Sequence, residues 1–175
     1  MLAEEYGEWE DSRRRIGLLC IDKDANLVVV ELKRTEDGGH MDLQAIRYAA
    51  MVSTMKFTRA VERHADYLRR IGKSDIDPTQ AILNFLGWTE PEDHFAKDTR
   101  IVLVSGEFSK EITTAVLWLN DRDLEITCVR LCPYSWGGRT LVDIQQVIPL
   151  PEATEHQVQL RHKEAEKRRA QENGP

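Results

Sequence analysis

The chain has 175 residues, of which 41% are hydrophobic and 31% charged, and its formal net charge is −6. This composition is typical of one globular domain and excludes a chain that is disordered throughout. No apolar run approaches the ~20 residues of a membrane-spanning helix, the acidic N-terminus is unlike a secretion signal, and three scattered cysteines do not form a disulfide framework. We therefore expect a cytoplasmic protein with no membrane partner.

The first half of the chain predicts three strands followed by two helices. Two apolar, β-branched runs at residues 15–21 and 27–33 flank a turn-forming segment, and together they predict a β-hairpin. A short strand is expected before the hairpin, at residues 2–6. Apolar residues at helical spacing then predict helices over residues 42–53 and 58–71.

The next part of the chain carries two recognisable helix starts. Asp77 and Pro78 form an N-cap and first-turn pair that predicts a short third helix. A strand at residues 100–105 is apolar enough to lie in the centre of a sheet. Ser109 then predicts the start of a fourth helix.

The last part of the predicted domain is a pair of strands. They are expected at residues 124–132 and 140–148, around a connection at residues 133–139. The polar segment 151–175 is expected to be a frayed helix or disordered, outside a domain at residues 1–150. The order of the elements predicts a mixed α/β fold in which helices flank a central β-sheet.

Positive charge is concentrated in one part of the sequence. Residues 44–73 contain seven lysines and arginines against two acids, a net charge of +5, and residues 75–98 have a net charge of −5. A further basic run precedes the second strand and consists of Arg13, Arg14 and Arg15. Such stretches are typical either of a solvated helix face or of a nucleic-acid contact, and charge alone does not decide between the two.

Two charged residues stand at the end of the apolar strand 27–33. Because side chains alternate across a strand, Glu31 and Lys33 point to one face together with Val29, and Leu32 points to the other. One interpretation is that the strand simply ends here and its charges reach water. The other is that the pair belongs to a functional site.

The helix after this strand supports the second interpretation. Gln44 and Tyr48 are four residues apart, so they share one face of that helix. A short loop separates them from Glu31, which lets the helix lie beside the carboxyl end of the strand. In mixed sheets this is the usual place for a ligand or a catalytic group.

Three sequence blocks, in this order, resemble the PD-(D/E)xK nuclease superfamily. They are Arg15-Ile16-Gly17-Leu18-Leu19, Glu31-Leu32-Lys33-Arg34 and Gln44-Ala45-Ile46-Arg47-Tyr48. The chain is most similar to the NucS-type endonuclease domain of archaea and bacteria, whose members read Arg-Ile-Asp-Leu-Leu, Glu-Leu-Lys and Gln-x-x-x-Tyr. The likeness covers residues 2–55 with specific motifs and continues more loosely to about residue 150. It implies a restriction-endonuclease-like central sheet flanked by helices.

The resemblance implies metal-dependent cleavage of branched, mismatched or single-stranded DNA by an endodeoxyribonuclease. Glu31 would ligate Mg²⁺ or Mn²⁺ together with the backbone carbonyl of Leu32. Lys33 would orient the attacking water and offset charge on the phosphate. Gln44 and Tyr48 would complete the catalytic set by positioning the backbone or the lysine. The residues implied to contact DNA phosphates are Arg13, Arg14, Arg15, Arg34 and Arg47.

The sequence departs from the family at one metal ligand. The aspartate of the family falls on Gly17, which has no side chain to offer, and a family glutamate on a preceding helix would lie upstream of Met1. With a single carboxylate, the site is expected to hold Mg²⁺ poorly. Two alternatives follow. One is a module that binds nucleic acid without cleaving it, and the other is an interaction domain of a larger protein or of a homodimer.

Overall fold

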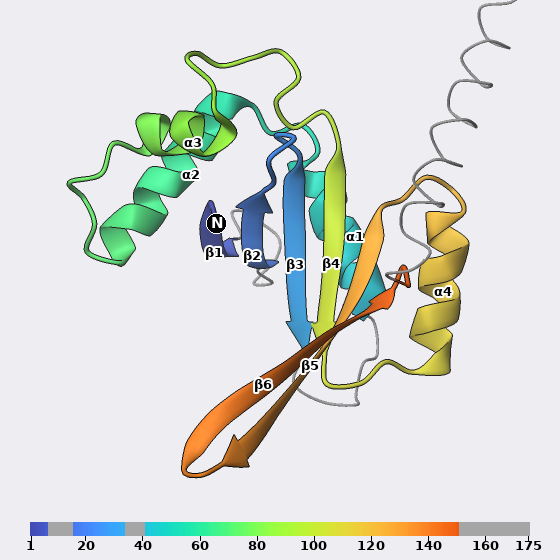
Figure 1. Ribbon diagram of the computed structural model, residues 1–175. Coiled ribbons are helices and arrows are strands. Elements are labelled where there is room, and N and C mark those ends of the chain that lie inside the picture. Colours follow the sequence, from blue (N-terminus) through green and yellow to red (C-terminus); the bar gives the residue numbers. More distant parts are fainter. Residues whose placement is uncertain (7–15, 34–40, 151–175) are drawn as a thin grey trace, which may run out of the picture.

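The computed structural model of the chain describes residues 1–6, 16–33 and 41–150 (Figure 1). Within these ranges it consists of a six-stranded mixed β-sheet and four helices, which confirms the predicted mixed α/β class. No helix in these ranges is long and apolar enough to cross a membrane. The prediction for residues 151–175 falls outside the part of the chain that the structure describes.

The strands lie in the sheet in the same order as in the chain. They are β1 (Ala3–Tyr6), β2 (Ile16–Ile21), β3 (Leu27–Lys33), β4 (Thr99–Ser105), β5 (Ile126–Trp136) and β6 (Arg139–Ile148). The pairs β1–β2, β2–β3 and β5–β6 are antiparallel, whereas β3–β4 and β4–β5 are parallel. Each parallel pair needs a long crossover connection, and the helices lie in these connections.

The four helices begin and end close to where the sequence predicts. They are α1 (Met41–Val52), α2 (Phe57–Arg70), α3 (Pro78–Leu86) and α4 (Lys110–Asn120). The Asp77 carboxylate accepts hydrogen bonds from two backbone N–H groups in the first turn of α3, and the Ser109 hydroxyl accepts one at the start of α4. Both predicted N-caps are therefore confirmed. Helix α3 stops at Gly87, whose φ of 75° is the left-handed conformation that favours glycine.

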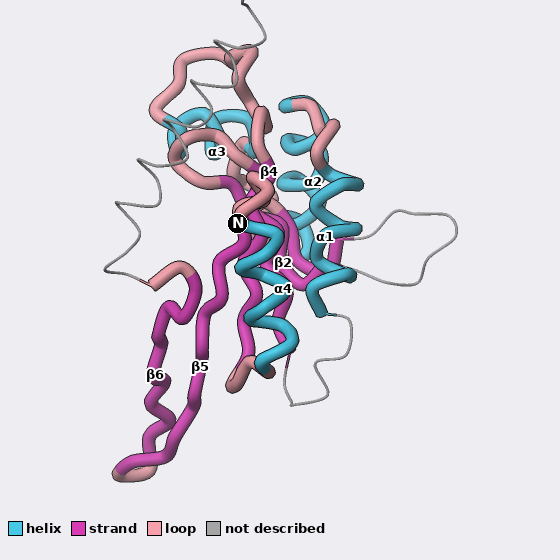
Figure 2. Tube along the Cα trace, turned by 90° about the vertical axis from the view of Figure 1, so that its right-hand side faces the viewer, coloured by secondary structure: helices cyan, strands magenta, loops and turns pink. Residues whose placement is uncertain are grey.

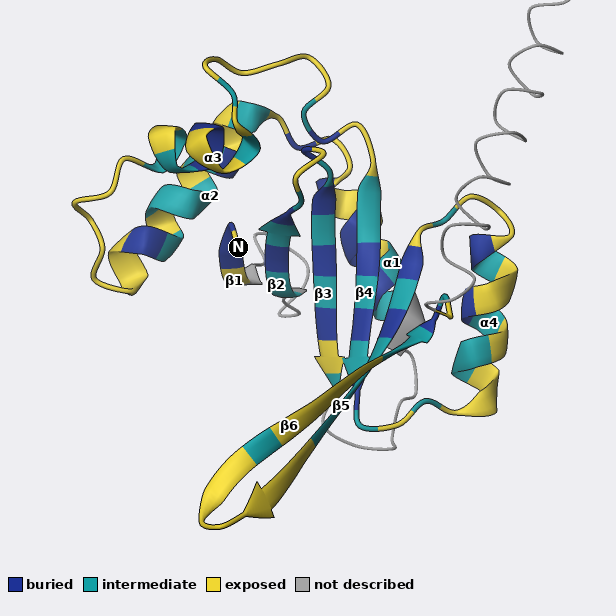
Figure 3. Cartoon of the chain, viewed as in Figure 1, coloured by how far each residue is buried: buried dark blue, intermediate teal, exposed yellow. Residues whose placement is uncertain are grey.

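Helix α1 covers one face of the sheet, where it packs against β3 and β4 (Figures 1 and 2). Strand residues that join the same core as α1 are fully buried, namely Leu19, Val29, Leu103 and Cys128. On the other face Val30 is only half-buried and Leu32 is 51% exposed (Figure 3). The core of the molecule therefore lies between the sheet and α1, and this face also carries the predicted site.

The hairpin of β5 and β6 is longer than the sequence predicts. The prediction of a connection over residues 133–139 is wrong, because β5 continues to Trp136 and only Gly137 and Gly138 form the turn. Their φ values of 57° and 74° are those of a two-residue type I′ turn. The pairing of β4 with β5 stops at Arg130, so at Pro133 strand β5 pairs only with β6. A proline, which has no backbone N–H to donate, is therefore tolerated there.

Candidate functional site at the carboxyl edge of the sheet

Glu31 lies near the carboxyl end of β3, on the buried face that α1 covers. Glu31 is only 5% exposed, and its Oε2 has no hydrogen-bond partner among the described residues. The Nζ of Lys33 lies 3.9 Å from Oε1, which is an ion-pair distance rather than a close hydrogen bond. Burial raises the pKa of the Glu31 carboxyl, and the charge of Lys33 and the backbone N–H of Gly17 oppose that rise only in part.

Gly17 of β2 precedes Leu18, which pairs with Val30 of β3, and the Gly17 backbone N–H donates a hydrogen bond to the Glu31 carboxylate. A Cβ atom at position 17 would lie 3.0 Å from the carbonyl oxygen of Val30 and 3.2 Å from a side-chain carbon of Leu32. Both distances are shorter than ordinary van der Waals contact, so any side chain here requires a small shift of β3. The absence of a side chain at Gly17 therefore allows the two strands their close approach.

Helix α1 supplies the predicted amide and phenol. The Gln44 Nε2 donates a hydrogen bond of 2.8 Å to the Tyr48 hydroxyl, so the two side chains do share one face of the helix. Tyr48 is 3% exposed and belongs to the core between α1 and the sheet. The bond lies within α1, and α1 packs against β3.

Two polar residues on the next strands lie level with Lys33. The register pairs Lys33 with Ser105 of β4, and Ser105 with Arg130 of β5. Ser105 is 6% exposed. The Arg130 Nη1 donates a 3.4 Å hydrogen bond to Gln145 Oε1, while its Nε is buried without a partner in the described ranges. Sequence reasoning missed both residues, although Ser105 ends a predicted apolar strand and Arg130 is a charged residue inside another.

Of the five arginines predicted to contact DNA, only Arg47 is among the described residues. Arg47 is exposed on α1. The other four lie outside the described residues, and they are Arg13, Arg14, Arg15 and Arg34. The two acids that precede this basic run, Glu10 and Asp11, also lie outside.

The basic stretch at residues 44–73 forms much of α2, where its arginines are paired with acids. Arg59 lies 2.7 Å from Glu62, Arg63 lies 3.0 Å from Asp66, Arg69 also pairs with Asp66, and Arg70 lies 3.0 Å from Glu4 of β1. Most of the positive charge on this helix is therefore locally neutralised. The sequence count overstated what α2 offers to an anion.

The residues of the edge do not fit the divalent metal that the resemblance implies. In the ranges that the structure describes, no group of three or more His, Cys, Asp and Glu side chains could hold a metal ion. Glu31 offers one carboxylate oxygen without a partner among the described residues, and its neighbours are Lys33 and the backbone of Gly17, which supplies no side chain. Mg²⁺ demands six oxygen ligands in octahedral geometry and is held by charged carboxylates. A metal here needs a further carboxylate from outside the described part of the chain.

Comparison with known proteins adds no family to these observations. No protein-family model matches the sequence, and neither curated proteins nor solved structures show a match. At the edge itself, Lys33 and Ser105 are the last residues of β3 and β4, and Arg130 of β5 pairs with Ser105. Helices α1 and α4 both begin at this edge, so the positive ends of their dipoles are there too (Figure 1).

Proposed function

We propose that this chain is a restriction-endonuclease-like domain that binds the phosphodiester backbone of DNA at the carboxyl edge of β3, β4 and β5. The observation that carries this proposal is the position of Lys33 beside the buried Glu31, where β3 ends. Mixed sheets commonly place their ligands at such an edge. The three sequence blocks support it, because the Gly17 backbone contacts Glu31 and the bonded pair of Gln44 and Tyr48 lies on the covering helix.

The overall charge of the protein restricts where DNA can bind. A net charge of −6 repels a polyanion from most of the surface, so attraction has to come from a local positive field. At the carboxyl edge the positive contributions are two side-chain cations and two helix N-termini, set against the Glu31 carboxylate beside Lys33. Contacts of this kind read the phosphate backbone and carry no base sequence.

A second candidate function is metal-dependent cleavage of branched, mismatched or single-stranded DNA. The buried Oε2 of Glu31 favours it, because a buried carboxylate oxygen without a partner is costly and such groups cluster at functional sites. Cleavage would need Mg²⁺ or Mn²⁺ and the further carboxylate that the described residues do not supply. For the chain as given, we therefore expect binding of DNA without cleavage.

Fluorescence anisotropy with labelled single-stranded and flapped oligonucleotides tests the binding. We expect affinity to fall steeply with salt, and Lys33→Gln to weaken binding about tenfold and to lower the salt slope by about 1. Lys23→Gln is the matched control, because Lys23 lies in the turn before β3, at the opposite end of that strand. Binding that is independent of salt, or equal effects of the two variants, would contradict the proposal.

Incubation of the same oligonucleotides with Mn²⁺ separates the two candidates. Intact DNA under conditions where the chain binds it supports binding as the function. Cleavage that disappears in Glu31→Gln would establish the second candidate instead, and would show that the missing carboxylate comes from residues outside the described ranges.

A further inference from the structure

We propose that Ser105 and Arg130 extend the site of Lys33 into a phosphate-binding row that crosses β3, β4 and β5. The inference rests on the proposed DNA binding and specifies the path of the DNA backbone, which would run across the strand ends. Neither residue is part of the three sequence blocks, and both are identified by the register of the sheet.

Lys33, Ser105 and Arg130 lie side by side on adjacent strands and point to the same face of the sheet. Lys33 pairs with Ser105, and Ser105 pairs with Arg130, in two successive parallel ladders. Neighbouring strands are ~4.8 Å apart, so the Cα atoms of Lys33 and Arg130 are about 10 Å apart with Ser105 between them. Two residues earlier in β4 and β5, Leu103 and Cys128 are fully buried in the same core, and the alternation of side chains puts Ser105 and Arg130 on that same face.

The Arg130 guanidinium has an N–H group without a hydrogen-bond partner among the described residues. A guanidinium carries five N–H groups in a planar fork that matches two phosphate oxygens. In the structure its Nε is buried with no partner among the described residues, and its Nη1 is held by the neutral Gln145 amide at 3.4 Å. No acidic side chain of these residues forms an ion pair with Arg130, in contrast to the arginines of α2. An anion would therefore satisfy a donor that is otherwise buried and unpaired.

The middle of the row is a small hydroxyl donor. Ser105 is buried between the two cations, and serine hydroxyls are frequent phosphate ligands. Helix α4 begins five residues later at Lys110 and brings the positive end of its dipole to the same edge. A phosphate at this edge would therefore meet a hydroxyl, two cations and a helix N-terminus.

The salt dependence of DNA binding tests the row. We expect Arg130→Gln to weaken binding of a single-stranded oligonucleotide five- to tenfold and to lower the salt slope by about 1, since one phosphate contact is lost. Arg130→Lys should keep the slope and recover only part of the affinity, because it keeps the charge and loses the fork. Ser105→Ala should weaken binding two- to threefold with an unchanged slope, because the hydroxyl is neutral. Circular dichroism checks that each variant is folded.

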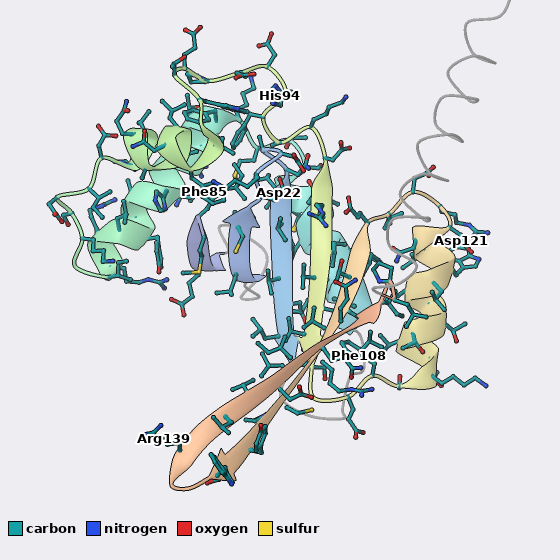
Figure 4. All side chains as sticks on the ribbon, viewed as in Figure 1. Asp22, Phe85, His94, Phe108, Asp121 and Arg139 are labelled. Carbon is teal, nitrogen blue, oxygen red and sulfur yellow. The ribbon has the colours of Figure 1, made fainter. Side chains whose placement is uncertain are left out.

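Arg139→Gln is the matched control, because Arg139 lies at the far tip of the same hairpin (Figure 4). It should leave both the affinity and the slope unchanged. If Lys33→Gln weakens binding but Arg130→Gln does not, the row is wrong and the proposed function stands. Equal effects of Arg130→Gln and Arg139→Gln would also overturn the row. If the unmodified chain shows no salt-dependent binding, the proposed function fails and the row fails with it.

Discussion

Two regions of the described structure, α2 and the carboxyl edge of the sheet, hold their positive charge in different ways. On α2 the arginines are paired with acids on the same helix or on β1. At the edge, Lys33 has a carboxylate at 3.9 Å and Arg130 has a neutral amide at 3.4 Å. The larger number of cations is on α2, but the more available ones are at the edge.

This difference determines which of the two regions binds an anion more favourably. A phosphate that approaches α2 competes with a carboxylate for each arginine, so the exchange gains little. A phosphate at the edge supplies a charged acceptor to groups that have weak partners or none in the described residues. Counting basic residues along the sequence is therefore a poor guide to the binding face of this protein. Substitutions at the carboxyl edge and on α2 test the two regions separately.

The largest effect is expected from Gly17→Asp, which adds a second carboxyl to β2, at the residue whose backbone contacts Glu31. The new Cβ crowds the carbonyl oxygen of Val30, so we expect the free energy of unfolding to drop by about 1–3 kcal/mol in metal-free buffer. Mn²⁺ should restore part of the loss, because it binds paired carboxylates in the folded state only. Thermal denaturation with and without Mn²⁺ measures both effects. Gly17→Ala shares the crowding but should show no recovery, and equal recovery in both variants would refute the pairing with Glu31.

A smaller loss is expected from Tyr48→Phe, which leaves the Gln44 amide without its 2.8 Å acceptor inside a buried site. We expect the free energy of unfolding to fall by about 1.5 kcal/mol, measured by urea denaturation. Tyr134→Phe is the matched control on the exposed hairpin and should change stability by less than about 0.5 kcal/mol. A loss no larger than that of the control would mean that the bonded pair does not stabilise α1 against the sheet.

Glu31→Gln should change how stability depends on pH. Because burial raises the pKa of Glu31, the folded chain binds a proton more readily than the unfolded chain does. This contribution is therefore favourable at low pH and is lost as pH rises from the ordinary glutamate pKa of about 4.3 through the raised value. At pH 7, Glu31→Gln should be more stable than the unmodified chain by about 1 kcal/mol.

Urea denaturation at pH 5 and pH 7 measures the effect of Glu31→Gln. The exposed Glu62 of α2 provides the comparison, and Glu62→Gln should follow the pH profile of the unmodified chain. Parallel profiles for Glu31→Gln and the unmodified chain would show that folding does not raise the pKa of Glu31.

The smallest effect is expected from Arg69→Gln on α2. Arg69 shares Asp66 with Arg63 and its side chain is 69% exposed, so its loss should change stability by less than about 0.5 kcal/mol. The affinity for DNA and its salt slope should also stay unchanged. A reduction in slope like that of Lys33→Gln would place DNA on α2 and reverse the comparison.

Local patterns in the sequence predicted the features that depend on neighbours in the chain. The alternation along β3 placed Glu31 and Lys33 on one face, and the four-residue spacing on α1 placed Gln44 against Tyr48. The N-cap of α3 at Asp77 followed from residue type alone. These features need no knowledge of tertiary structure.

Features that depend on distant strands could not be predicted in the same way. Ser105 is 72 positions from Lys33, and their common level is set by the register between β3 and β4. The hairpin was predicted too short because Pro133 is usually a turn residue, and only the end of β4 makes its place in β5 acceptable. The pairing of Arg70 with Glu4 likewise depends on where β1 lies beside α2.

The central claim is that DNA binds at the strand ends and not on α2. It is tested most directly by ¹H–¹⁵N chemical-shift mapping while a short single-stranded oligonucleotide is added to the labelled protein. The largest shifts are expected at the amides of Lys33, Ser105, Gly106 and Arg130, with residues 59–70 of α2 unchanged. Shifts concentrated on residues 59–70, with the strand ends unchanged, would contradict the claim.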